Sequence, residues 1–162
     1  MNRTAHRPSL PSAFFFALAL SIIWASPSLA RTTTIDDSGT IALEPAVSLR
    51  WQSVAPPRGG TNNTMVGATT LRVRLNVLPW LKRSGRIFLT LPAQPPGPLR
   101  ATWTSEGRLA AGTVRSGSRT LIYSGPITSP VLEDVLRFQF SLDGSLVRRP
   151  FPVTLRFEFD ED

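Results

Sequence analysis

Few side chains in this chain of 162 residues could do chemistry. Cysteine is absent, which excludes thiol nucleophiles, disulfides and cysteine-ligated metals. The only histidine is His6, and the only lysine is Lys82. Any Ser-His-Asp arrangement or histidine-ligated zinc would therefore depend on His6. A Ser–Lys dyad would have to use Lys82, and no motif surrounds it.

Carboxylates are the remaining potential catalysts. A glycosidase needs two of them about 5–10 Å apart in a cleft. Of the 11 acids, four crowd the C-terminus and two lie in a polar stretch at 36–37, as solvated charges do at chain ends. No calcium-loop signature surrounds Asp143 or the terminal acids. The sequence therefore predicts a non-enzymatic protein with no catalytic residues, no cofactor and no metal site.

Arginine supplies 17 of the 18 cations, and the formal net charge is +7. Arg72 and Arg74 share the outward face of one predicted strand, and Lys82, Arg83 and Arg86 follow at the next turn. If these strands pair, the five cations gather at one end of one sheet. Such a patch could bind phosphate or an acidic glycan, because guanidinium groups hydrogen-bond oxyanions in a bidentate manner. The alternative is a solvated sheet face that resists aggregation. No nucleic-acid-binding motif is present.

The first 30 residues are typical of a secretory signal peptide. Arg3 and Arg7 precede a 12-residue apolar run at 13–24, and small residues occupy Ser28 and Ala30. As a helix the run spans about 18 Å, too short for a hydrocarbon core of about 30 Å. We expect cleavage after Ala30 and export to the periplasm, cell surface or medium, with only transient membrane contact. Cleavage removes His6 and leaves 16 basic and 11 acidic residues, a net +5.

The remaining chain divides into a polar leader at 31–40, predicted to be flexible, and one domain at 41–162. Fifteen prolines and 11 glycines leave little room for long helices. Period-2 alternation of apolar residues predicts strands. These lie within 41–51, 69–78, 87–91, 99–104, 121–123, 136–142 and 153–159. The stretch 107–118 is predicted to be a loop, and a helical turn is expected at Pro130–Asp134.

Each predicted strand has one apolar and one polar face, the pattern of antiparallel sheets stacked in a sandwich. About seven short strands match an immunoglobulin-like antiparallel β-sandwich, preceded here by the signal-peptide helix. A closed barrel is the main alternative. Trp51 and Trp103 are in phase with the apolar face and are expected in the core. Trp80 follows Pro79 at a strand end and is expected to be exposed.

Three features together resemble secreted bacterial immunoglobulin-like sandwiches and, loosely, the cysteine-free subunits of chaperone–usher fimbriae. They are the signal peptide, the polar segment after it and the last alternating strand at 153–159. The resemblance implies that an N-terminal strand completes a neighbour's sheet. The chain departs from that pattern because 31–40 offers only Ile35 as a large apolar residue, and because it ends in three acids at 160–162.

The sequence therefore predicts an exported, non-enzymatic β-sandwich that acts in binding or assembly, with a protein partner or through self-assembly. One alternative is a fimbrial subunit assembled by strand exchange. Another is a module that binds acidic glycans through the arginine patch. No nucleic-acid partner is expected.

Overall fold

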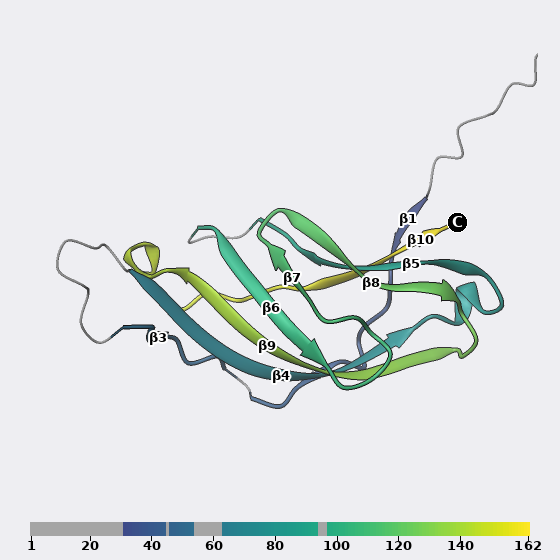
Figure 1. Ribbon diagram of the computed structural model, residues 1–162, viewed down its shortest axis with the longest axis horizontal. Coiled ribbons are helices and arrows are strands. Elements are labelled where there is room, and N and C mark those ends of the chain that lie inside the picture. The colour runs from purple at the N-terminus through teal and green to yellow at the C-terminus, as the bar shows by residue number, and fades with distance from the viewer. Residues whose placement is uncertain (1–30, 45, 54–62, 94–96) are drawn as a thin grey trace, which may run out of the picture.

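The computed structural model describes residues 31–44, 46–53, 63–93 and 97–162 (Figure 1). They form two antiparallel sheets packed face to face, which confirms the predicted β-sandwich. Of its ten strands, seven have four or more residues. The predicted signal-peptide helix at 1–30 lies outside the described residues. Within the described part of the chain, no helix is long and apolar enough to cross a bilayer.

The smaller sheet has four strands in the order β1-β10-β5-β8. Their bounds are β1 Thr32–Thr34, β5 Ser84–Leu91, β8 Ser118–Pro126 and β10 Arg156–Glu161. The larger sheet has six strands in the order β2-β4-β9-β6-β7, with β3 also paired to β4. Their bounds are β2 Ile41–Ala42, β3 Arg50–Trp51, β4 Thr64–Asn76, β6 Leu99–Ser105, β7 Gly112–Arg115 and β9 Val131–Asp143. Two 3-10 turns complete the set, at Leu78–Trp80 and Gly144–Leu146.

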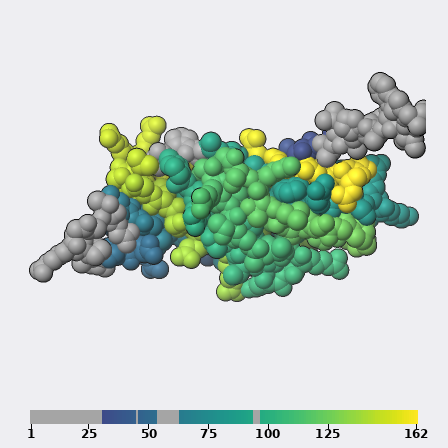
Figure 2. Space-filling model, turned by 45° about the horizontal axis from the view of Figure 1, so that its top comes forward, coloured from purple at the N-terminus to yellow at the C-terminus, as the bar shows by residue number. Residues whose placement is uncertain are grey.

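The strands β4 and β9 form the backbone of the larger sheet. Each has 13 residues, and they pair without interruption from Thr64↔Asp143 to Asn76↔Val131. They run side by side along the length of the molecule (Figure 1), and Figure 2 shows its elongated shape. The helical turn predicted at Pro130–Asp134 does not form, because β9 begins at Val131. Leu132 and Asp134 are buried and continue the inward alternation of that strand.

The core lies between the sheets and consists of the alternate residues that the pattern predicted to face inward. Val73, Leu75 and Val77 of β4 are fully buried. The prediction for Trp103 is confirmed, since it is 2% exposed and its indole N–H donates to the carbonyl of Ala110 at 2.9 Å. The prediction for Trp80 is wrong. Its ring stacks on Phe159 with centroids 4.5 Å apart, because the 3-10 turn directs it back under the four-stranded sheet.

Two other apolar side chains are more exposed than the sequence pattern suggests. Trp51, expected in the core, is 51% exposed because the short β3 pairs with the far end of β4. In β8 the inward residue is Ile122, whereas Leu121 is exposed. A register shift at Ile87/Phe88 of β5 makes Ile122 the extra residue of a bulge, and this changes which side chains face the core.

The segment 31–40 differs from the predicted flexible leader. It contains β1, which pairs with β10 in the register Thr32↔Asp160 to Thr34↔Glu158. The next residue, Ile35, is 2% exposed, and its N–H donates to the carbonyl of Phe157 at 2.8 Å. A single buried isoleucine and a ladder to β10 thus hold the segment as an edge strand.

The predicted loop at 107–118 contains the short strand β7, which pairs with β6. Asp134 holds the turn between them, although its carboxylate is only 6% exposed. It accepts hydrogen bonds from the N–H of Leu109 at 2.8 Å and the hydroxyl of Ser105 at 2.9 Å. These bonds satisfy a buried polar group, so we assign Asp134 a structural role.

Candidate binding groove

The five cations predicted to form one patch are divided between the two sheets. Arg72 and Arg74 lie on β4, whereas Lys82, Arg83 and Arg86 lie on the turn before β5 and on β5 itself. The premise of the prediction was that these strands pair. It is wrong, because β4 pairs with β9 and β5 pairs with β10 and β8.

Three of these cations also have carboxylate partners. Arg74 pairs with Glu133 at 3.3 Å, Arg83 with Glu161 at 2.9 Å and Arg86 with Asp162 at 3.2 Å. Both C-terminal acids lie beside β5 because β10 is its neighbour in the sheet. The acidic C-terminus therefore neutralises part of the predicted patch.

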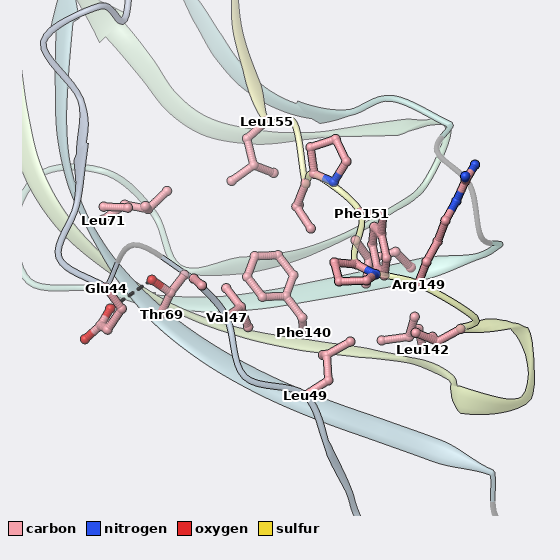
Figure 3. Close-up of a pocket in the computed structure, with 17 residues that line it drawn as sticks. Glu44, Val47, Leu49, Thr69, Leu71, Phe140, Leu142, Arg149, Phe151 and Leu155 are labelled. Atoms are coloured by element: carbon pink, nitrogen blue, oxygen red, sulfur yellow. Dashed lines mark hydrogen bonds between the residues drawn. The ribbon is translucent and has the colours of Figure 1, made fainter.

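A different site lies at the end of the sandwich away from β1. It is an apolar cavity of about 380 Å³ between the larger sheet and two irregular segments, 42–49 and 147–155 (Figure 3). We call it the groove. Its floor consists of side chains from β4, β6 and β9: Thr69, Leu71, Leu99, Phe140 and Leu142. Its walls are formed by Ala42, Glu44, Ala46, Val47, Leu49, Val147, Arg149, Pro150, Phe151, Pro152, Val153 and Leu155.

The wall segments alternate like strands, although their inward residues belong to no strand. Phe151, Val153 and Leu155 are half-buried and line the groove, while the residues between them are exposed. In the other wall Val47 and Leu49 are half-buried on either side of the exposed Ser48. Within the part of the chain that the structure describes, these five inward residues make no backbone–backbone hydrogen bond. Their inward side chains are thus placed without the ladder that normally fixes a strand.

The groove is open because the smaller sheet ends before it reaches this end of the molecule. On one side of β10, β1 stops at Thr34 and the chain crosses to the larger sheet, where Asp36 bridges to Asn76. On the other side, β5 ends at Leu91 and is followed by Pro92. Proline has no N–H to continue a ladder. Among the described residues, Val153 and Leu155 therefore have no backbone partner on the side where β1 has ended.

Gly67 allows the other wall to lie close to β4. A Cβ built there would lie 2.6 Å from a methyl carbon of Val47 and 3.1 Å from the carbonyl oxygen of Ser48. Real Cβ atoms essentially never make a contact as short as the 2.6 Å to Val47, so a larger residue would displace this wall. Glycine at position 67 is therefore needed for the close packing of this wall, and not for an unusual backbone conformation.

Polar groups occur at the edge of the groove. The Oε2 atom of Glu44 accepts hydrogen bonds from the N–H of Thr70 and the hydroxyl of Thr69, both at 2.8 Å. The first of these bonds is the main cause that lowers the pKa of Glu44 below its ordinary value, and the second adds to it. In Figure 3 Arg149 extends away from the apolar side chains. The site offers apolar contact over most of its area and one anchored carboxylate.

The lining contains one acid, Glu44, and the described residues hold no group of three acids or histidines that could hold a metal. Searches of family models, curated proteins and solved structures found no match to this chain. Sequence reasoning predicted a strand at 153–159 but missed the groove beside it. The available signal was Pro150 and Pro152, which interrupt pairing just before an apolar alternation.

Proposed function

We propose that this chain is an exported, non-enzymatic binding protein whose groove takes up an extended apolar segment of a partner protein. The observation that carries the proposal is the strand-like alternation of the two facing wall segments. Among the described residues, their inward members Val47, Leu49, Phe151, Val153 and Leu155 make no backbone–backbone hydrogen bond. The signal-peptide pattern at 1–30 supports export.

The backbone direction of the 151–155 wall supports an added strand. In antiparallel pairing, alternate residues direct their N–H and C=O groups to opposite sides of a strand. The carbonyl of Phe157 accepts from Ile35, so it points toward β1. If the segment continues this alternation, the N–H and C=O groups of Leu155 and Val153 point to the same side as those of Phe157. The strand β1 has ended at that point. A segment placed there would extend the line of β1 and gain main-chain hydrogen bonds.

The side chains define the chemistry of the occupant. Every second residue of an added strand would point into the groove, whose lining is formed mainly by Leu, Val, Phe and Pro. A volume of about 380 Å³ accommodates a few aliphatic side chains and falls in the usual range of ligand sites. An apolar-alternating segment fits, whereas a charged segment would lose hydration without gaining a partner.

Self-assembly through the chain's own N-terminal segment is the less favoured form of this proposal. Strand exchange between copies would donate residues 31–40. In this structure β1 already pairs with β10 of its own chain, and Ile35 is buried there. Donation would first have to break that pairing.

The test uses the folded protein and a fluorescent synthetic peptide in which valine alternates with threonine. We expect saturable binding measured by fluorescence anisotropy. Val153→Asp should weaken it by about tenfold or more, because the variant places a charge against the incoming apolar side chains. Leu121→Asp is the matched control, since Leu121 is an exposed apolar residue on β8, outside the groove. It should bind as the unmodified protein does.

A second peptide and a second ligand make the test decisive. N-methylating the valines removes the N–H groups that an antiparallel added strand directs at Val153 and Leu155, so this peptide should not bind. Equal binding of both peptides would overturn strand addition. Binding of decanoate with no binding of either peptide would show that the groove takes an acyl chain rather than a protein segment.

A further inference from the structure

Three arginines form one row across the outer face of the larger sheet. The pairing register runs Arg115↔Arg100 between β7 and β6, and Arg100↔Ser141 between β6 and β9. It continues with Ser141↔Val66 to β4 and Val66↔Arg50 to β3. We call Arg115, Arg100 and Arg50 the arginine row. All three are exposed, and the row crosses four strand intervals, or about 19 Å.

Nothing in the described part of the chain neutralises this row. Arg74 and Arg137 on the same face pair with Glu133 and Glu106, but no guanidinium group of the arginine row makes an ion pair or hydrogen bond with a described residue. The nearest acid in the register is Asp143, two residues beyond Ser141. Its Oδ1 atom accepts from the N–H of Ser145 at 2.9 Å and from its hydroxyl at 2.7 Å.

The pair Arg100↔Arg115 is unfavourable unless an anion binds it. Directly opposite residues on one face of an antiparallel pair have Cβ atoms about 5 Å apart, and like charges there destabilise the sheet. An oxyanion between the two guanidinium groups reverses the sign of that interaction, because each can donate two hydrogen bonds to it.

The surroundings of the row select among anions. Next to it lie hydroxyl and amide side chains, including Thr102 and Thr113, whose Oγ1 atoms are 3.1 Å apart, and Gln139. The outward positions of β4, β6, β7 and β9 hold no aromatic residue. Single-stranded nucleic acids bind largely through base stacking on aromatic side chains, which this face lacks. A single phosphate could not reach from Arg115 to Arg50.

We propose that the arginine row binds an acidic polysaccharide, with carboxylate or sulfate groups on Arg100 and Arg115 and the chain extending across the sheet toward Arg50. This site is separate from the groove and uses different strands. It is also not the patch that the sequence predicted, whose members lie on both sheets. Its ligand is anionic, whereas the ligand of the groove is apolar.

The test measures binding of the folded protein to polygalacturonic acid, with neutral dextran as the comparison. We expect binding to polygalacturonic acid alone, with an affinity that falls as salt rises. The double variant R100Q/R115Q should lower the affinity by about tenfold or more, because charge-assisted hydrogen bonds are lost. Its melting temperature should stay the same or rise, since the variant relieves like-charge repulsion.

The matched control is R83Q/R86Q, which removes the same charge from the other sheet. It should keep most of the affinity. An equal loss in both double variants would overturn the site, because net charge alone would then explain binding. Preference for a single-stranded oligonucleotide, or equal retention of dextran, would also overturn it. Peptide binding in the groove should be unchanged in R100Q/R115Q, so either proposal can fail while the other stands.

Discussion

The two ends of the sandwich share their long strands but differ in how the inward apolar face is covered. At the end near β1, Phe157 and Phe159 of β10 are paired on both sides and fully buried. At the other end, the segment leading into β10 keeps the same alternation, but its inward residues Val153 and Leu155 make no backbone–backbone hydrogen bond among the described residues. The strand β4 shows the same division, since Val73 is fully buried and Leu71 lines the groove.

This difference shows that the alternation of apolar residues determines which face of a strand points inward, but not which part of the chain covers that face. At the closed end the covering layer is the smaller sheet and Trp80. At the groove end it is two irregular segments around an apolar cavity. Apolar side chains placed without a covering layer are the physical basis of a binding site, because a ligand can supply the missing contacts.

The largest expected effect comes from truncating the closed end. Phe159→Ala removes a ring that is fully buried and stacked on Trp80 at 4.5 Å. We expect the free energy of unfolding to fall by about 3–5 kcal/mol, because the change loses transfer energy and leaves a cavity. Urea unfolding monitored by tryptophan fluorescence measures this loss.

The same truncation at the groove end is the matched comparison. Phe151 is half-buried in the wall and belongs to no strand. Phe151→Ala should cost about 1 kcal/mol or less, since its ring keeps solvent contact in the native state. Equal losses at the two positions would show that the groove wall is part of the cooperative core.

The smallest expected effect is that acid destabilises the groove wall by protonating Glu44. The N–H of Thr70 and the hydroxyl of Thr69 hold the pKa of Glu44 below its ordinary value of 4.5. The folded-state pKa is lowered, so the carboxylate stabilises the fold above the unfolded pKa. That contribution is lost as pH falls through the folded pKa. The amide shift of Thr70 in an NMR titration below pH 4.5 should report the loss.

The control for this titration is Glu44→Gln, in which the side chain cannot ionise. Its Thr70 amide should show no transition in the same range. A transition of equal size in the variant would mean that another group titrates and that Glu44 does not anchor the wall.

Sequence alone predicted the sandwich because the long strands alternate strictly. Val73, Leu75, Val77, Phe157 and Phe159 face inward as expected. The short strand β7 escaped prediction because Val114 is its only large apolar residue. The bulge in β8 was not predicted either, because an extra residue in a strand cannot be recognised from the residue types alone.

Features that depend on long-range pairing could not be predicted. The arginine patch required β4 to pair with β5, and only the fold decides that they lie in different sheets. The burial of Trp51 and Trp80 is the reverse of the prediction, because burial depends on which layer lies opposite each side chain. The groove and the arginine row both arise from strand order.

The most direct test of the account is amide hydrogen exchange of the 151–161 segment, with and without the valine–threonine peptide. In the free protein we expect the amides of Val153 and Leu155 to exchange rapidly, while those of residues 157–160 in β10 are protected by pairing on both sides. Saturating peptide should slow exchange at Val153 and Leu155. Strong protection of these two amides in the free protein, or no change on peptide binding, would contradict the account.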